Sequence, residues 1–516
     1  MKQTITHLFY GIFLLSLGII SCNKDIVEVD SNYHALQPVK LDLNAGSWKP
    51  FFAGASTDYP VPAPDDVNSA AYQNELKELK ILVSNLTDQQ KKIIDYWKVG
   101  SVLRWNEIMR ELVAKHNLAP YQKEDGTYPV PSASNPFSYP EFPFSNPPYA
   151  ARAYAYMSIA QYDALIMAWK FKAQYNRPAP YKIDAGIQVS IPKNELSSYP
   201  SEDAVLSGAS FELMRLLFPA DIEFIKQKAE EEKNYRLWSG ANVKSEIVAG
   251  DSLGRWVARK VIQRAKTDGM GAAGGSPAIW KQLETTCLAR NETPWLSLES
   301  PKRPPMLCLF GNVKSVLFDA SLVSSLRAVP PPPTNSEKMR EELNEVLKYT
   351  QNATREQMRI INFWADGAGT YTPPGHWNAI ASEEFVKNHY SEVRWARNYA
   401  VLNAALMDAA IICWDTKFFY FNARPCQLNP AIKTLTGVPN FPAYISGHST
   451  FSGAAATVLS YLIPQRRLEF EAMAIEASNS RIYGGLHYRS DCEQGLIAGR
   501  KVGNYAVDRA KVDGAN

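Results

Sequence analysis

Apolar residues recur every three or four positions along most of this 516-residue chain. Such spacing gathers them on one face of an α-helix, whereas the strict alternation expected of strands is scarce. The pattern predicts helices over residues 87–116, 150–175, 203–218, 246–265, 337–364, 392–420, 449–463 and 492–510. The expected fold class is therefore all-α.

The sequence also repeats itself at an offset of 245 residues. Residues 152–257 align with residues 397–502 without a gap, and matching Gly, Trp, Pro and Arg residues keep that register. Further upstream, residues 87–97 resemble residues 354–364 at a different offset. Chance likeness between helices would not hold one register over a hundred residues, so we predict an internal duplication. Two related helical bundles would then pack about a pseudo-two-fold axis.

The N-terminus predicts export to a bacterial cell envelope. Leu8–Ser21 is apolar, too short to span a bilayer and typical of a signal peptide. The sequence Ile-Ile-Ser before Cys22 resembles a lipobox, which implies a lipid on Cys22. Since Asn23 is not the aspartate that retains lipoproteins at the inner membrane, the outer membrane is the expected location. An ordinary secretory signal with an incidental cysteine is the alternative.

Five segments follow from these signals. No stretch after the leader reaches 18 apolar residues, so the lipid would be the only membrane contact. The predicted segments are a signal peptide (1–22), a tether and N-terminal extension (23–74), a degenerate, non-catalytic bundle (75–265), a Gly/Pro-rich connection (266–336) and a catalytic bundle (337–516).

Composition excludes some classes of function. Lys and Arg number 55 against 52 Asp and Glu, and this near balance argues against a nucleic-acid partner held by bulk positive charge. Beyond Cys22 there are five cysteines, so at least one thiol is free. Cys287 and Cys308 share a loop-rich segment and either form a disulfide or stay free. The sequence leaves the oligomeric state open.

The candidate chemistry lies in three segments of the second half. Lys417 and Arg424 are seven residues apart, so we expect them on one face of a helix that Pro425 ends. Ser446-Gly447-His448 stands where an apolar helix begins, and the free N–H groups there form an anion site. Surface cations and an ordinary N-cap are the alternatives.

The third segment contains Arg481, His487 and Asp491. On a helix, His487 and Asp491 would lie one turn apart. The carboxylate would then orient the imidazole and leave its other nitrogen as a nucleophile or ligand. A purely structural His–Asp pair is the alternative. Taken together, three cations, one anion-binding turn and two histidines suit a tetrahedral or trigonal-bipyramidal oxyanion.

This order of motifs resembles that of the type-2 phosphatidic acid phosphatase and vanadium-dependent haloperoxidase superfamily. The one departure is Ile445, where the family usually has proline. A wider resemblance to the bacterial haloperoxidase-like branch includes residues 147–152, 363–367 and 372–377. The resemblance implies an α-helical bundle fold, often doubled in the haloperoxidase branch.

The resemblance also implies a role for each residue. Lys417, Arg424, Ser446, Gly447 and Arg481 would bind vanadate or phosphate. His487 would be the axial vanadium ligand or the phosphorylated nucleophile, His448 the acid–base residue, and Asp491 the group that orients His487. Asp366 would pair with Arg481 as a supporting residue.

Two activities fit these residues, because vanadate and phosphate share shape and charge. Trp414 and Phe441 resemble the aromatic halide pocket of chloroperoxidases, although simple core packing also explains them. They favour a vanadate-dependent haloperoxidase that uses hydrogen peroxide and halide. The alternative is a phosphatase that acts on phosphomonoesters or lipid phosphates, and a non-enzymatic oxyanion-binding lipoprotein is a third possibility.

The repeat predicts that the first half is inactive. Glu202, Asp203 and Asn242 stand there in place of Gly447, His448 and His487. Acidic residues at that position would repel an anion.

Overall fold

The computed structural model describes residues 33–118, 146–299 and 302–515. The chain divides into a short unit, residues 1–34, and a large unit that runs from Ala35 to Asn516. Within the described residues of the large unit, the secondary structure is α-helix and short 3₁₀ turns, with one isolated β-bridge between Pro294 and Asn422. The predicted all-α fold class is confirmed. Cys22 lies outside the described residues.

The helices of the large unit fall into two sets and a connection. The first set is α2 (Ala70–Val83), α3 (Asp88–Trp97), α4 (Ser101–His116), α5 (Pro147–Tyr175), α6 (Pro180–Ile183), α7 (Glu202–Leu217), α8 (Ile222–Trp238) and α9 (Lys244–Lys266). The connection contains α10 (Pro277–Ala289) and α11 (Val323–Leu326). The second set is α12 (Glu337–Gln351), α13 (Arg355–Phe363), α14 (Thr372–Lys387), α15 (Glu392–Tyr420), α16 (Pro425–Leu428), α17 (Gly447–Leu462), α18 (Arg467–Tyr483) and α19 (Arg489–Lys511).

Two predicted helices are in fact broken, and several were missed. The segment 87–116 divides at Gly100, whose φ of 125° no helix accommodates, and 337–364 divides where Thr354 caps α13. Apolar periodicity is weak in α8, which carries Lys and Glu along most of its length and buries few apolar side chains. Such a helix is stabilised by the bundle around it rather than by its own pattern.

The bounds of the helices recur at the offset of the sequence repeat. α5 and α15, α7 and α17, α8 and α18, and α9 and α19 each begin and end 245 residues apart. Both long helices end in a left-handed residue, Asn176 in α5 and Phe421 in α15. The buried carboxylates of Asp163 and Asp408 each accept backbone N–H groups from an earlier loop. The duplication itself stays a prediction.

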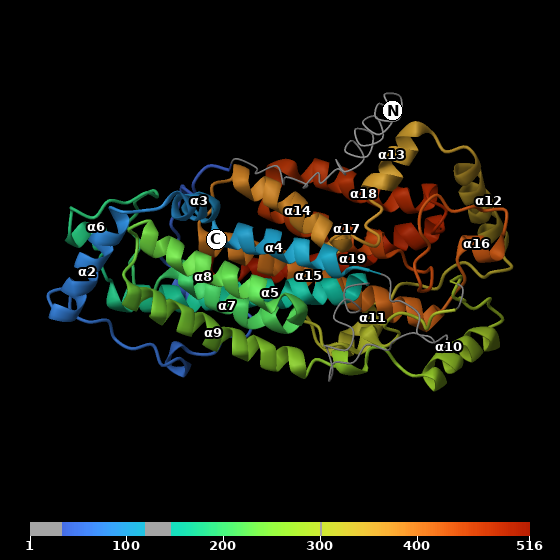
Figure 1. The fold of residues 1–516 in the computed structure, drawn as a ribbon. Coiled ribbons are helices and arrows are strands. Elements are labelled where there is room, and N and C mark those ends of the chain that lie inside the picture. Colours follow the sequence, from blue (N-terminus) through green and yellow to red (C-terminus); the bar gives the residue numbers. More distant parts are fainter. Residues whose placement is uncertain (1–32, 119–145, 300–301, 516) are drawn as a thin grey trace, which may run out of the picture. The chain divides into compact units, whose positions relative to one another are not determined.

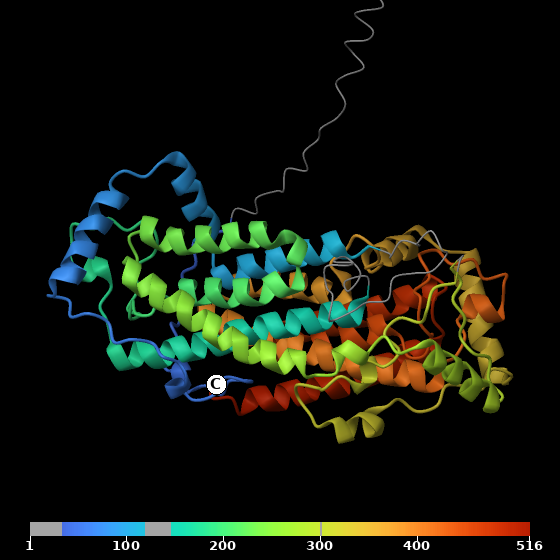
Figure 2. The same cartoon turned by 60° about the horizontal axis from the view of Figure 1, so that its bottom comes forward.

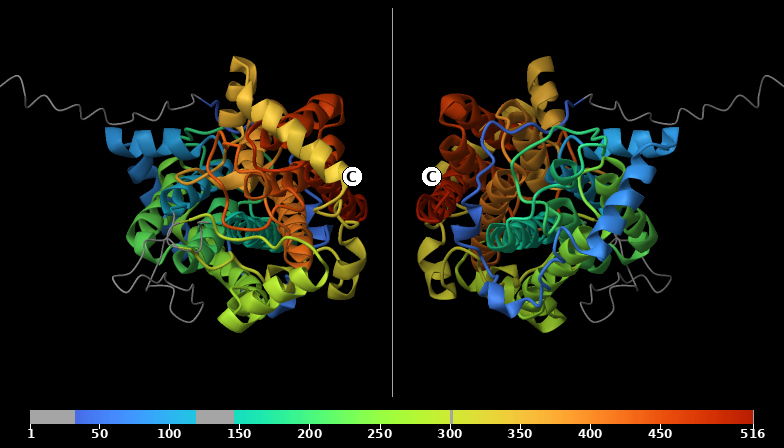
Figure 3. Two further views of the ribbon diagram at one scale, coloured as in Figure 1. Left: turned by 90° about the vertical axis from the view of Figure 1, so that its right-hand side faces the viewer. Right: turned by 90° about the vertical axis from the view of Figure 1, so that its left-hand side faces the viewer.

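α5 and α15 pack along each other in the middle of the large unit (Figure 1). α7 and α9 pack on α5, whereas α17 and α19 pack on α15, as the rotated view also shows (Figure 2). Views along the long helices show the two sets side by side (Figure 3). α17 and α19 approach closely at Gly499, where an added Cβ would lie 2.1 Å from the Thr450 carbonyl oxygen. This contact holds the amino-terminal part of α17 against α19.

The structure also describes part of the N-terminal extension and the five cysteines that follow Cys22. From Ala35 onward the extension packs on the helices, because Asp42 pairs with Arg394 and residues 51–53 donate to Asp163. Cys287 and Cys308 are both free and buried, so the disulfide that the sequence left open is absent. Among the described residues, no helix is long and apolar enough to span a membrane.

Candidate active site

A cavity of about 230 Å³ opens where α15 ends and α17 begins. Its wall contains residues from the second and third sequence motifs and from the loop after α13. The predicted site residues in that wall are Asp366, Trp414, Phe441, Gly447, His448, Arg481 and His487. Lys417, Arg424, Ser446 and Asp491 are fully buried around them. The fold therefore gathers the predicted site residues in one place.

Lys417 and Arg424 meet, but not on one face of a helix as predicted. α15 ends at Tyr420, and Arg424 lies beyond it as the N-cap of α16. The two cations converge because both donate to the backbone of residues 441–443. The Nζ of Lys417 lies 2.8 Å from the Pro442 oxygen, and the Nε of Arg424 lies 3.0 Å from the Phe441 oxygen. The loop before Ser446 is thus held by the cations that would bind the oxyanion.

Ser446 and Gly447 form the predicted helix start. Ser446 is the N-cap of α17, and its hydroxyl accepts the Ser449 N–H. Gly447 lines the cavity, so open space lies before the first N–H groups of the helix, and a Cβ added there would lie in ordinary contact with Phe451 at 3.9 Å. Open space at a helix N-terminus is what an oxyanion needs.

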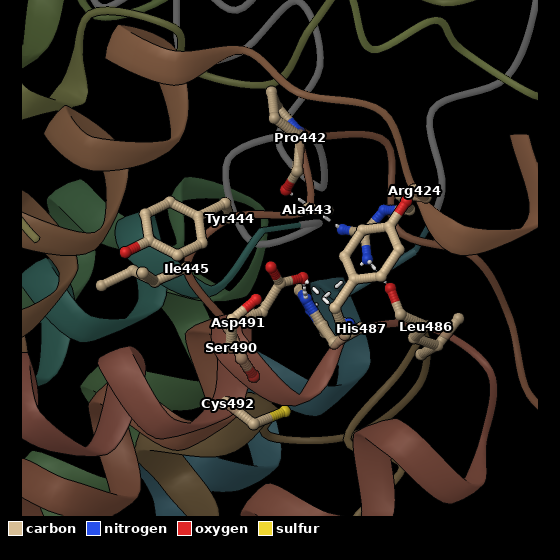
Figure 4. A network of polar contacts seen from close by, with 12 residues as sticks. Arg424, Pro442, Ala443, Tyr444, Ile445, Leu486, His487, Ser490, Asp491 and Cys492 are labelled. Atoms are coloured by element: carbon tan, nitrogen blue, oxygen red, sulfur yellow. Dashed lines mark hydrogen bonds and ion pairs between the residues drawn. The ribbon is translucent and has the colours of Figure 1, made fainter. Parts of the chain in front are cut away.

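His487 and Asp491 form the predicted pair. The Nδ1 of His487 lies 2.9 Å from the Asp491 carboxylate, although His487 precedes α19 and only Asp491 lies in its first turn. The other nitrogen, Nε2, faces Arg424 at 3.4 Å (Figure 4). Burial and the charges of Arg424, Lys417 and Arg481 hold the pKa of His487 well below its usual range. A neutral imidazole with Nδ1 fixed presents Nε2 as a lone-pair donor.

The three cations lack a carboxylate partner of their own. None of Lys417, Arg424 and Arg481 forms a salt bridge within 4.0 Å in the described part of the chain. The Nε of Arg481 is buried without any hydrogen-bond partner. Burial lowers the pKa of both arginines to about 10, so they stay charged near neutral pH. Such uncompensated buried charge is costly unless an anion binds there.

Asp366 belongs to the site, but the predicted pair with Arg481 is absent. Its carboxylate lies instead between two histidines, 3.0 Å from the Nδ1 of His376 and 3.6 Å from the Nε2 of His448. Arg481 donates to the Trp364 carbonyl oxygen, two residues before Asp366. Sequence reasoning assigned no role to His376. The segment Thr372-Pro-Pro-Gly-His-Trp377, which is part of the family resemblance, could have pointed to this histidine.

Trp414 and Phe441 form an aromatic corner of the cavity. Their ring centroids are 5.0 Å apart, and the Lys417 ammonium lies 5.0 Å from the Phe441 centroid. The Trp414 Nε1–H donates to the Met306 carbonyl oxygen, so a segment of the connection holds this wall in place. An apolar wall beside a cation suits a weakly hydrated anion.

The first half contains a comparable cluster whose cations are already neutralised. Lys172 and Arg236, which precede Lys417 and Arg481 by 245 residues, contact the Glu202 carboxylate at 2.8 and 3.1 Å. Asp203 adds a second ion pair with Arg236 at 2.8 Å. Asn242 donates to Glu246 at 2.8 Å, as His487 would to Asp491. Glu202 stands where the second half has Gly447 and its open space.

Comparison with known proteins agrees with this geometry. Residues 398–508 match the family model described as the PAP2 superfamily. The segment that holds the site therefore resembles that superfamily, in agreement with the motifs. No curated protein matches the chain.

The fold resembles solved structures of vanadium-dependent haloperoxidases. One is described as the first bacterial vanadium-dependent iodoperoxidase, with 21% identity, a TM-score of 0.57, and coverage of 79% of this chain and 96% of that one. Another is a holo-type bacterial vanadium-dependent chloroperoxidase, with 13% identity, a TM-score of 0.51, and coverage of 74% and 96%. At these identities the likeness concerns the fold.

Proposed function

We propose that this chain is a vanadate-dependent haloperoxidase-like enzyme, which oxidises a halide with hydrogen peroxide. Overall, peroxide is reduced to water, the halide becomes hypohalous acid, and one proton is consumed. The observation that carries the proposal is the cluster of Lys417, Arg424 and Arg481. Arg481 lines the cavity at the start of α17, and Lys417 and Arg424 are buried against the backbone of residues 441–443 beside it. None of the three has a carboxylate partner among the described residues, which fits a bound oxyanion.

The residues present fit vanadate. Lys417, Arg424 and Arg481 would neutralise its oxygens, the first N–H groups of α17 would bind it, and the Nε2 of His487 would hold the vanadium. Two observations support this fit: the orphaned Nε of Arg481 and the open space at Gly447. When bound, vanadate supplies Lewis-acid activation of hydrogen peroxide.

The chain's own groups would position the reactants and move the proton. His448 lines the cavity, and burial together with Arg481 lowers its pKa to about 4. It is therefore a neutral base near pH 7, able to accept a proton from hydrogen peroxide. Trp414 and Phe441 would keep water from the halide, and the fixed cations would stabilise the negative charge that develops.

A phosphomonoesterase is the second candidate, because the same cations would bind a phosphoryl group. The Nε2 of His487 would attack phosphorus as the ester bond breaks, and His448 would protonate the leaving alcohol. Water would then hydrolyse the phosphohistidine. The His487–Asp491 contact of 2.9 Å supports this candidate equally, whereas the Trp414–Phe441 corner favours the haloperoxidase.

We further propose that the protein is exported and anchored by a lipid on Cys22, in keeping with the leader sequence Leu8–Ser21. Metabolic labelling with a fatty acid would test this. Wild type should carry the label and Cys22→Ser should not, and equal labelling of both would contradict the anchor.

The deciding experiment uses the purified chain after removal of phosphate. One sample receives orthovanadate, hydrogen peroxide, bromide and a phenolic halogenation dye, and another receives p-nitrophenyl phosphate alone. Vanadate-dependent halogenation that is lost in His487→Ala supports the haloperoxidase. If vanadate inhibits phosphate release and no halogenation is found, the result supports the phosphatase instead.

A matched pair of tryptophan variants tests whether the Trp414–Phe441 corner binds the halide. Trp414→Phe should raise KM for the halide without changing vanadate affinity. Trp169→Phe, at the matching position in the first half, should change neither. Equal effects from the two variants would reduce Trp414 to a packing residue.

A further inference from the structure

Asp366 lies between the acid–base residue His448 and a second histidine, His376. Its two carboxylate oxygens face different rings: Oδ1 lies 3.0 Å from the Nδ1 of His376, and Oδ2 lies 3.6 Å from the Nε2 of His448. The first contact is a hydrogen bond. The second is longer, as catalytic hydrogen bonds often are before substrate binds. One carboxylate thus links the acid–base histidine to a histidine outside the oxyanion motifs.

The position of His376 is fixed from several sides. Its ring stacks on Trp364 with a centroid separation of 4.6 Å and also contacts Phe363 at 4.9 Å. The next residue, Trp377, donates to Ser452 on α17, the helix that carries His448. α14 is therefore tied to the helix of the acid–base residue while it presents His376 to Asp366.

The loop that carries Asp366 is held equally firmly. The side-chain amide of Asn117 donates to the carbonyl oxygens of Gly367 and Thr370, each at 2.9 Å. Arg481 donates to the Trp364 oxygen at 2.9 Å. These contacts fix the backbone, but the direction of the Asp366 carboxylate depends on its hydrogen bond from His376.

We propose that His376 is a positioning residue for proton transfer at His448, acting through the Asp366 carboxylate that the two histidines share. This rests on the proposed function of the oxyanion site and holds for either of its two chemistries. By donating to Oδ1, His376 turns Oδ2 toward His448 and withdraws part of the negative charge. His448 is then oriented through Nε2, which leaves Nδ1 for the reactants.

The electrostatics around Asp366 agree with this arrangement. Burial opposes ionisation of Asp366, but the hydrogen bond from His376 and the nearby His448 outweigh it and lower the pKa of Asp366 to about 2. The charged groups that act on His448 are Arg481 and His376, which lower its pKa, and Asp366, which raises it. His487 lies across the cavity. Loss of His376 should therefore make His448 easier to protonate.

The test is an NMR titration of the histidine side chains in the phosphate-free full chain, with His448 assigned through His448→Gln. His376→Phe keeps an aromatic ring against Trp364 but removes the donor. It should raise the His448 pKa by about half to one unit, the value of one ordinary intramolecular hydrogen bond. His376→Asn places an amide N–H near the former Nδ1 and should restore the wild-type value.

Two controls separate this role from a purely structural one. His116 forms a buried pair with Asp221 at 2.5 Å in the first half, and His116→Asn should leave His448 unchanged. In an Asp366→Asn background, His376→Phe should no longer move the His448 pKa, because the path between them is gone. Should His376→Phe fail to fold, His376→Leu, which also lacks a donor, replaces it in the same cycle.

An unchanged His448 titration in folded His376→Phe overturns the proposal, as does an equal shift from His116→Asn. A shift that persists in Asp366→Asn also overturns it, since the effect would then bypass the carboxylate. The titration needs no turnover. Absence of both halogenation and phosphate release would therefore refute the proposed function, whereas the His448 titration tests His376 alone. Where turnover is found, the limb of the pH profile that reports His448 should move by the same amount.

Discussion

We predict that the Glu202 carboxylate neutralises the buried cations of the first half, as a bound oxyanion would neutralise those of the second half. Its carboxylate contacts Lys172 and Arg236 at 2.8 and 3.1 Å, and it is only 7% exposed. Removal of one partner from a buried ion pair typically costs about 3–5 kcal/mol, because the other charge stays buried. Asp203 still pairs with Arg236, so Glu202→Gln should cost about 3 kcal/mol, near the lower limit.

The effect of pH follows from the same contacts. Burial opposes ionisation of Glu202, but the charges of Lys172 and Arg236 outweigh it and lower its pKa to about 2. A group with a lowered pKa stabilises the fold above its unfolded pKa of about 4.3 and loses that contribution as pH falls through the folded value. The difference between wild type and Glu202→Gln should therefore be constant above about pH 5 and shrink toward pH 2.

Thermal and urea unfolding, followed by circular dichroism, measure this difference. Glu356→Gln is the control, because its pair with Arg359 is exposed and its loss should leave stability unchanged. A third variant, Glu202→Gly, opens the space that Gly447 leaves in the second half. Added phosphate should stabilise this variant more than wild type, by about 2.7 kcal/mol at a hundredfold excess over Kd. If Glu202→Gln unfolds like wild type, or phosphate stabilises Glu202→Gly no better than wild type, the reasoning fails.

Three further predictions concern the second half. Asp491→Asn should weaken vanadate binding about 10- to 100-fold, because His487 loses the acceptor that fixes its tautomer. Titration calorimetry measures the Kd, and an unchanged Kd would show that the pair is only structural. His448→Ala should reduce turnover by about 10²- to 10⁴-fold yet change phosphate Kd little, so parallel losses would argue against an acid–base role. Burial lowers the pKa of Lys417 to about 7, so sulfate affinity should be full below that pH and fall about tenfold per unit above it. Lys417→Gln should flatten this dependence, and a sloped profile in that variant would assign it to another group.

Some helices of the fold could be predicted from the local sequence pattern. The apolar period and the repeat gave α5, α7, α9, α15, α17 and α19 to within a few residues, because these helices bury continuous apolar faces. The apolar pattern did not predict α8 and α18, because neither has a strong apolar stripe and both are stabilised by neighbouring helices. The break at Gly100 was also hidden, because local propensity favours helix on both sides of it.

The sequence by itself indicated the main residues of the candidate site, because the charge and hydrogen-bonding capacity of Lys417, Arg481 and His487 depend on residue type. It could not give their geometry. Arg424 reaches Lys417 through shared backbone carbonyls rather than a shared helix face, and Asp366 meets two histidines rather than Arg481. These contacts join residues that lie on different helices and loops. Only tertiary packing decides such distances, since a side chain's partner is set by where the whole bundle brings it.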